Sequence, residues 1–164
     1  MAWGKRKEMP ATGSRAPSFR LKDLEGKERS LDDLLASGPV LLAFFKESCP
    51  VCQFTFPVLE RLHQGAGAAL QVLAVSQDDA RSTKQFNRDC GVSFTTLLDE
   101  ARAGYPASNA FGISHVPSCF LIEKDGTVSW TMEGFSKGEL EAVGGRVSVS
   151  PFKPDDYVPE WKAG

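Results

Sequence analysis

Apolar residues along the chain form short continuous runs that alternate with stretches of helical periodicity. The run from Val40 to Phe45 is entirely apolar, the pattern of a strand covered on both faces, and a helical segment follows at about 51–63. The same alternation continues, with two further strands expected at 70–75 and 95–98 and two further helices at 79–90 and 107–111. Strands that alternate with helices predict an α/β domain with parallel strands at its centre.

Turn signals predict a β-hairpin on each side of this alternating region. The first joins strands at 19–21 and 28–30, and Ser30 then resembles the N-cap of a short helix. The second joins antiparallel strands at 118–123 and 127–131. Together these segments predict a mixed central sheet flanked by helices, with an N-terminal β-hairpin extension.

Composition divides the chain into three parts. Residues 1–15 mix proline, glycine, serine and charge without periodicity, which is typical of an N-terminal arm. The domain is expected to span 16–145 and to close with a helix at 136–143 that Gly144–Gly145 ends. Residues 146–164 carry three prolines, so we expect an extended C-terminal tail there.

Charge and hydropathy exclude two classes of partner. The sequence holds 19 Lys and Arg against 21 Asp and Glu, a net charge of -2, so neither nucleic acid nor a membrane surface is expected to bind. The longest apolar run, 39–45, is far shorter than the roughly 20 residues of a membrane helix. No apolar stretch follows the charged residues 1–7, so we expect no signal peptide and a cytoplasmic location, unless a longer native N-terminus was trimmed.

Two of the four cysteines lie three residues apart, between the first long strand and its helix. Cys49 falls where the helix begins, and the unbonded N–H groups and helix dipole there favour a thiolate. Pro50 suits the first helical position, where its missing N–H costs nothing. Cys52 falls within the apolar arc of the helix. We therefore expect Cys49 to attack disulfides and Cys52, which is shielded, to resolve the intermediate.

A single pair of this spacing has other interpretations. It could be half of a zinc site or two structural thiols. Zinc would need two more ligands, and the candidates form no second close pair: His63, Cys90, His115 and Cys119. Because a strand precedes the pair and a helix follows it directly, redox chemistry is favoured, with no metal or other cofactor.

Five segments carry a resemblance to a known family: Ala16–Phe19, Phe44–Cys52, Phe56–Glu60, Gly112–Ile122 and Asp125–Gly126. Their sequence and order resemble the TlpA/ResA-like branch of the thioredoxin superfamily, a redoxin of the alkyl hydroperoxide reductase/thiol-specific antioxidant class. The resemblance covers about residues 16–143. It implies a thioredoxin fold and a thiol-disulfide oxidoreductase whose partners are protein or small-molecule thiols and disulfides.

The resemblance also implies a substrate-binding surface. It makes Pro117 a cis-proline that faces the dithiol, and it makes the backbone of Val116 pair with a substrate peptide. Pro50, between the two cysteines, belongs to the same surface. Without the resemblance, the expectation for Val116–Pro117 is an ordinary trans bond, because only about 5–6% of X-Pro bonds in folded proteins are cis.

The chain departs from the family at positions that usually support the dithiol. Ser48 and Ala43 stand where thioredoxins carry a tryptophan and a buried aspartate. Thr55 stands where ResA-like proteins usually carry a glutamate. The proton of Cys52 therefore lacks an obvious acceptor, and a water, the Thr55 hydroxyl or Lys46 are the candidates.

Two further residues near the expected site have both a functional and a structural interpretation. His115 could tune the thiolate or the docking surface, or it could be a solvated loop histidine. Cys119 shares the strand face of Pro117 by period-two alternation, so it is either a third redox thiol or a small buried apolar residue. The aromatic residues of the tail could pack on the domain or on a second subunit, and the sequence predicts no oligomeric state.

Two alternative functions remain open. A peroxiredoxin would carry proline and threonine ahead of its peroxidatic cysteine. Aligned on Cys52, those positions hold Phe45 and Cys49, so both supports are absent. The other alternative is a non-enzymatic copper or zinc carrier that uses the two thiolates with His115 or Cys119.

Overall fold

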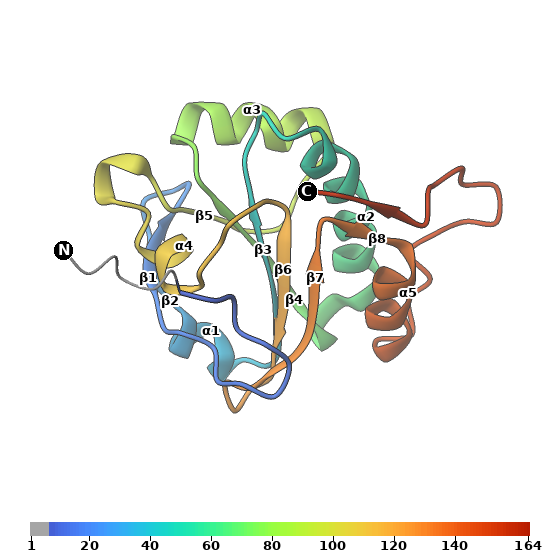
Figure 1. Ribbon diagram of the computed structural model, residues 1–164, viewed down its shortest axis with the longest axis horizontal. Coiled ribbons are helices and arrows are strands. Elements are labelled where there is room, and N and C mark those ends of the chain that lie inside the picture. The colour runs from blue at the N-terminus through green and yellow to red at the C-terminus, as the bar shows by residue number, and fades with distance from the viewer. Residues whose placement is uncertain (1–6) are drawn as a thin grey trace.

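The structure is a computed structural model that describes residues 7–164, and its centre is a seven-stranded sheet (Figure 1). The strands are β1 (Arg20–Asp23), β2 (Glu28–Ser30), β3 (Val40–Phe45), β4 (Gln71–Ser76), β5 (Thr96–Leu98), β6 (Ser118–Ile122) and β7 (Val128–Glu133). Their order is β2-β1-β5-β4-β3-β6-β7. The pairs β3–β4 and β4–β5 are parallel, and every other neighbouring pair is antiparallel. The predicted mixed sheet with its N-terminal hairpin is confirmed.

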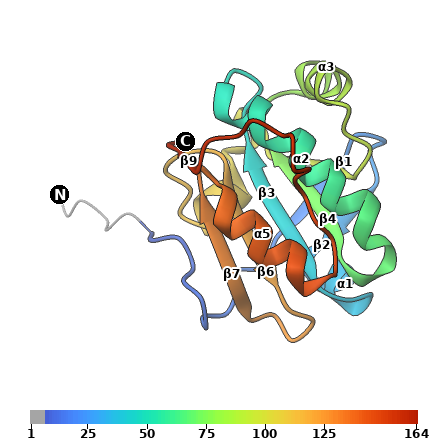
Figure 2. The same ribbon diagram turned by 90° about the vertical axis from the view of Figure 1, so that its right-hand side faces the viewer.

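Helices cover both faces of this sheet (Figures 1 and 2). They are α1 (Leu31–Ala36), α2 (Pro50–Ala66), α3 (Ala80–Cys90), α4 (Pro106–Ala110) and α5 (Lys137–Arg146), with short 3₁₀ turns η1 (Gly67–Ala69) and η2 (Ala101–Ala103). One core cluster joins the sheet to α2, α3 and α5, and a second joins the opposite face to α1 and α4. None of the helices within residues 7–164 is both long and apolar enough to cross a membrane.

Strand β3 lies inside the sheet and contributes side chains to both core clusters. All six of its residues are buried, as the continuous apolar run predicts. Successive side chains of a strand point to opposite faces, so Phe44 packs in the α1–α4 core and Phe45 in the α2–α3 core. The ring centroid of Phe45 lies 4.5 Å from those of Phe56 and Phe86. The chain leaves this packed strand and enters the active-site segment directly.

The helix start predicted at Ser30 and the helix end predicted at Gly91 are confirmed. The Ser30 side chain accepts a hydrogen bond from the Asp33 amide at 3.1 Å, which caps α1. Asp79 caps α3, and Gly91 ends it in the left-handed conformation with φ 68°. These caps satisfy backbone groups that a helix terminus leaves free.

The predicted end of α5 is wrong. The helix does not stop at Gly144–Gly145 but continues to Arg146. A Cβ atom at Gly144 would collide with the carbonyl oxygen of Val149 and lie 2.9 Å from Cδ of Pro151. Glycine at this position lets the chain after α5 pass close to the helix, so the residue serves packing and not helix termination.

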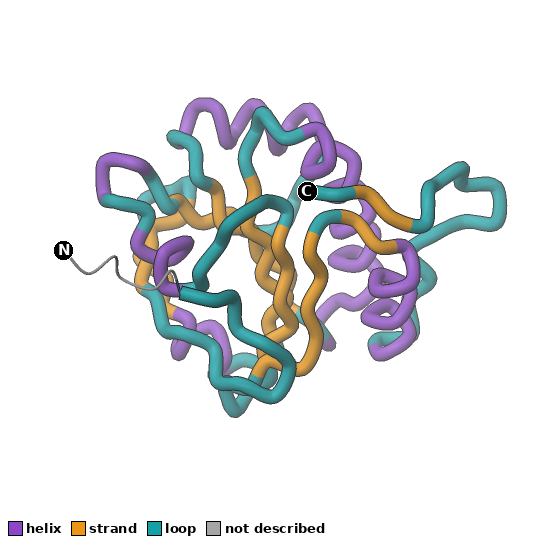
Figure 3. Tube along the Cα trace, in the orientation of Figure 1, coloured by secondary structure: helices purple, strands orange, loops and turns teal. Residues whose placement is uncertain are grey.

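The tail after α5 folds back onto the domain. Most of it is loop, and it ends in a short strand β9 (Trp161–Lys162) that pairs antiparallel with β8 (Phe135–Ser136) (Figure 3). The ring of Phe152 packs 6.2 Å from that of Phe135, whereas Tyr157 is fully exposed. One tail aromatic therefore packs on the domain. Figure 2 shows the segment running along α2 toward the end where that helix begins.

The described part of the N-terminal arm runs beside β7. The Gly13 amide donates to the Val128 carbonyl at 2.8 Å, and the Val128 amide donates to the Ser14 carbonyl at 2.8 Å. An isolated bridge joins Arg15 to Thr127. The first six residues of the predicted arm lie outside the described residues.

Candidate active site

The two close cysteines lie at the N-terminus of α2, as predicted. Cys49 is the N-cap residue, and Pro50 occupies the first helical position. The Cys52 amide donates a hydrogen bond to Cys49 Sγ at 3.2 Å. This amide is one of the N–H groups that the first helical turn leaves without a backbone partner. The Cys49 sulfur thus sits where the helix dipole and an N–H donor favour negative charge.

The two sulfurs differ in exposure, and burial sets the acidity of Cys52. Cys49 is partly exposed, whereas the exposed fraction of Cys52 is 0%. Burial raises the pKa of the Cys52 thiol far above its usual value of 9.0, and a hydrogen bond with Cys49 raises it further. A hydrogen bond with the Lys46 backbone offsets only part of this shift. Solvent can reach Cys49, whereas the buried Cys52 thiol stays protonated beneath it.

A cis peptide bond between Val116 and Pro117 faces the dithiol. The Cys49 thiol donates a hydrogen bond to the Val116 carbonyl at 3.4 Å. This contact joins residues that are 67 positions apart in the sequence. The cis-proline loop and the N-terminus of α2 therefore form one surface, with the backbone of Val116 at its centre.

The proposed proton acceptors make other contacts. The buried Thr55 hydroxyl donates to the Val51 carbonyl one helical turn earlier, at 2.7 Å. The Lys46 side chain is exposed, and this residue reaches the dithiol through its backbone: its carbonyl accepts from the Cys49 amide at 3.2 Å. The proton of Cys52 is therefore not held by either side chain in this arrangement.

His115 lies beside the cis-proline loop, but other polar groups hold its ring. Its Nδ1 lies 2.9 Å from the Ser114 hydroxyl, and its Nε2 lies 3.3 Å from a carboxylate oxygen of Glu133. Glu133 carries no sequence signal for this contact, because nothing local links the end of β7 to this loop. The two ring nitrogens of His115 are thus both engaged beside the cis-proline loop.

Cys119 and Cys90 lie near the dithiol helix in different ways. Cys119 is buried on β6 opposite Ala43, in the same core as Cys52, and burial raises the pKa of its thiol to about 12. The Cys90 thiol donates to the Gln53 carbonyl at 3.9 Å. That carbonyl is free because Pro57, four residues later, has no N–H to donate.

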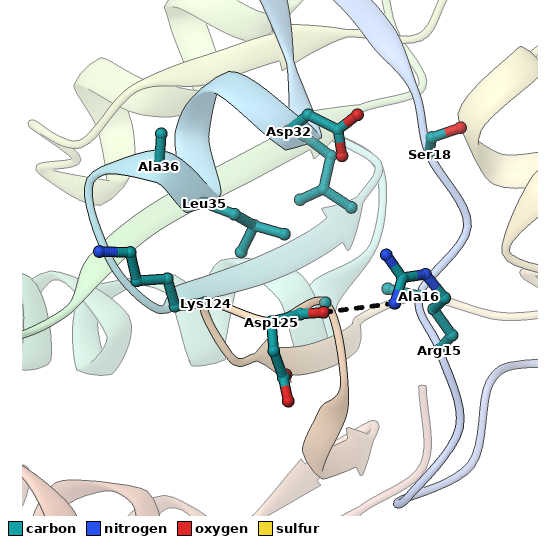
Figure 4. A pocket seen from close by; sticks show the side chains of 10 residues that line it. Arg15, Ala16, Ser18, Asp32, Leu35, Ala36, Lys124 and Asp125 are labelled. Carbon is teal, nitrogen blue, oxygen red and sulfur yellow. Dashed lines mark hydrogen bonds between the residues drawn. The ribbon is translucent and has the colours of Figure 1, made fainter.

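A pocket at the other end of β6 is separate from the dithiol. It lies between the N-terminal arm, α1 and the β6–β7 turn (Figure 4). Arg15 reaches across it and donates to the Asp125 carbonyl at 3.4 Å. Pro117 precedes β6 and Asp125 follows it, so the length of the strand separates the pocket from the active-site loop. Within residues 7–164, no three His, Cys, Asp or Glu side chains group in a way that could hold a metal ion.

The buried Cys52 thiol predicts a pH dependence of stability in the reduced protein. Its pKa is higher in the folded chain than in the unfolded one, so its stabilising contribution is complete below pH 9 and declines as the pH rises above it. The loss approaches about 1.4 kcal/mol per pH unit. Urea unfolding with reductant, followed up to about pH 10.5, is expected to show a shallower decline for Cys52→Ala than for the parent.

Cys119→Ala is the matched comparison, because burial also raises the pKa of the Cys119 thiol. The stability of this variant too is expected to decline less steeply with pH than that of the parent chain. A decline in Cys52→Ala as steep as in the parent chain would contradict the assignment of Cys52 as a buried, neutral thiol.

Comparison with known proteins agrees with this geometry. Residues 12–131 match the model of the AhpC/TSA family. The thiol-disulfide oxidoreductase ResA of Geobacillus thermodenitrificans is 33% identical over 128 residues, which cover 76% of this chain and 70% of that protein. ResA of Bacillus subtilis is 31% identical over 130 residues, covering 78% and 70%.

A solved structure confirms the thioredoxin fold. The thioredoxin domain of a thiol-disulfide oxidoreductase from Bacteroides vulgatus superposes with a TM-score of 0.74 at 22% identity, covering 84% of this chain and 98% of that one. At this identity the likeness concerns the fold, and the family match and the ResA relatives carry the assignment of class. The chain belongs to the AhpC/TSA family, in its thioredoxin-fold, thiol-disulfide oxidoreductase branch.

Proposed function

We propose that Cys49 is the attacking thiol of disulfide exchange and that Cys52 resolves the intermediate. The observation that carries the proposal is the asymmetry of the pair: a partly exposed sulfur at the helix N-cap and a fully buried one a turn later. Only the thiolate is the nucleophile in this chemistry. Cys49 Sγ accepts a hydrogen bond from the Cys52 amide and lies at the N-terminus of α2, where the helix dipole is positive.

The first step is attack on a partner disulfide. The Cys49 thiol gives its proton to water, and the thiolate attacks one sulfur of the disulfide. A bond forms between Cys49 Sγ and that sulfur, the partner's S–S bond breaks, and the other half leaves as a thiolate. The product is a mixed disulfide, and no electrons have left the three sulfurs.

The second step releases the partner. Cys52 gives its proton to water and attacks Cys49 Sγ, the intramolecular disulfide forms, the mixed disulfide breaks, and the second half of the partner leaves as a thiolate. Two electrons have then passed from the dithiol to the partner, and the reverse sequence oxidises a dithiol. Hydrogen bonding to Cys49 and its charge both raise the Cys52 pKa. The mixed disulfide removes both effects, so formation of the intermediate itself makes Cys52 easier to ionise.

The partner is expected to bind along the cis-proline loop. An extended peptide can hydrogen-bond with free backbone groups of a loop or sheet edge, and Val116 lies directly beside the Cys49 sulfur. Pro50, Val116 and Pro117 form the contact surface in this proposal. Both protein disulfides and small-molecule disulfides fit it, since the attacking sulfur is partly exposed.

Three expectations from the sequence remain predictions. They are a cytoplasmic location, the lack of a nucleic-acid partner and the lack of a membrane partner. Recovery of the protein with membranes after cell fractionation would contradict the first and the last.

Trapping of the intermediate tests the assignment. Cys52→Ser is expected to accumulate a stable mixed disulfide at Cys49 when the reduced variant meets excess small disulfide, because no thiol remains in place to resolve it. Mass spectrometry of the intact protein and of its peptides would show one bound half-disulfide. Cys90→Ser is the control and should form the intramolecular disulfide, as the parent does. Trapping at Cys52 in Cys49→Ser but not at Cys49 in Cys52→Ser would reverse the two roles.

A further inference from the structure

The last residues of the tail lie across the active-site loop. Strand β9 pairs with β8 through Phe135 with Lys162 and Ser136 with Trp161. One residue earlier, the Glu160 carbonyl accepts from the Lys137 amide at 2.9 Å. Figures 1 and 2 place this end of the chain at the edge of the molecule where α2 begins. The tail therefore ends beside the dithiol although it is more than a hundred positions from it in the sequence.

Gly164 packs directly on the backbone that the substrate is expected to use. A Cβ atom at this position would collide with the Val116 carbonyl oxygen and lie 2.9 Å from the Val116 carbonyl carbon. The same carbonyl accepts the hydrogen bond from the Cys49 thiol. The tail therefore occupies the space beside the Val116 carbonyl, and a substrate peptide cannot pair with that carbonyl while Gly164 packs on it.

Gly134 provides a second close contact. Its backbone has φ +68°, and a Cβ atom there would collide with the Lys162 carbonyl oxygen and lie 2.8 Å from the Gly164 nitrogen. Its amide donates to the Pro117 carbonyl at 2.8 Å. Glycine in this conformation lets two backbones approach closely. Gly134 thus holds the cis-proline loop on one side and leaves space for the tail on the other.

Few side-chain contacts hold the tail in place. The Lys162 ammonium lies 4.9 Å from the ring centroid of Phe54, a cation–π contact, and the Phe54 ring packs on Phe135 at 4.8 Å. The Trp161 side chain is 62% exposed. A segment with a two-residue ladder and little buried apolar surface opens with a small free energy. This attachment is suited to reversible displacement.

We propose that residues 160–164 are a resident occupant of the peptide-docking surface, which a protein substrate must displace before Cys49 can attack its disulfide. The inference rests on the proposed function and adds one step before docking, the displacement of the tail. When only a fraction of molecules has the surface open, the apparent affinity for a docked peptide falls by that fraction. A small disulfide needs the sulfur but not the docking surface, so the tail slows protein substrates selectively.

A truncated chain that ends at Pro159 tests this inference in two assays. The reduced protein is given either insulin or a small aromatic disulfide, and kcat/KM is measured for each. Truncation is expected to raise kcat/KM for insulin at least about fivefold and to leave that for the small disulfide within about twofold. Tyr157→Ala is the matched control, because this tail residue is fully exposed, and it should behave as the parent chain does.

Gly164→Val is the second variant and keeps β9 intact. Its side chain would collide with the Val116 carbonyl, so it should move the insulin rate in the same direction as truncation. If the truncated chain folds poorly, the insulin rate of Gly164→Val tests the tail proposal alone. An insulin rate that is unchanged or lower in both variants, with the small disulfide still reduced, would overturn the tail proposal and leave the proposed function standing. A parent chain that reduces neither substrate would instead contradict the proposed function.

Discussion

Replacing Cys49 by serine is expected to lower the rate of disulfide reduction by at least about three orders of magnitude. The serine hydroxyl stays protonated at neutral pH, so the variant keeps the shape of the site but lacks the nucleophile. Cys52 cannot take over, because it is buried and burial raises the pKa of its thiol. Insulin reduction and reduction of a small aromatic disulfide would both measure the loss.

Cys49→Ser and Cys52→Ser together distinguish disulfide exchange from peroxide reduction. A peroxidase whose reactive thiol is Cys52 would consume peroxide in a reaction that Cys52→Ser abolishes and that does not depend on Cys49 for its first step. Cys90→Ser is the control for the general loss of a thiol, since the Cys90 thiol hydrogen-bonds to the Gln53 carbonyl on the dithiol helix. Disulfide reduction by Cys49→Ser at the parental rate would refute the assignment of Cys49.

Replacing Phe45 by alanine is expected to lower the free energy of unfolding by about 3–5 kcal/mol. The Phe45 ring is fully buried between those of Phe56 and Phe86, each 4.5 Å away, so truncation leaves a cavity under the dithiol helix. The urea midpoint should fall by the corresponding amount, with an unchanged dependence on denaturant.

Tyr157→Ala provides the comparison for this change, because it also removes an aromatic ring but from a fully exposed position. Its free energy of unfolding should stay within about 0.5 kcal/mol of the parent value. If Phe45→Ala were as mild as Tyr157→Ala, β3 would not be the central strand of the core that supports the site.

Most of the sheet could be predicted because its signals are local. The limits of β3 follow from six consecutive apolar residues, and those of α3 from an aspartate before it and a glycine after it. The end of α5 could not be predicted, because Gly144 serves a contact with Val149 that depends on how the tail returns. A glycine has the same appearance in a sequence whether it ends a helix or admits a neighbouring backbone.

The parts of the site likewise differ in how far the sequence predicts them. The positions of Cys49 and Cys52 follow from helix periodicity, whereas the cis bond before Pro117 rested on a family resemblance. The contact of His115 with Glu133 and the placement of the tail on Val116 join residues that are distant in sequence. No local pattern marks a ladder as short as β8–β9, so these parts required the folded structure.

The position of Gly164 has a practical consequence for the design of expression vectors. Any purification tag fused after this residue would begin at the Val116 carbonyl and would leave the domain beside Cys49. Such a tag would change how readily the tail leaves the Val116 carbonyl, and therefore the measured reactivity of Cys49. An N-terminal tag with a cleavable linker avoids the problem, because the described start of the arm packs through Met9 on the α1–α4 core, on the face of the sheet away from the dithiol helix.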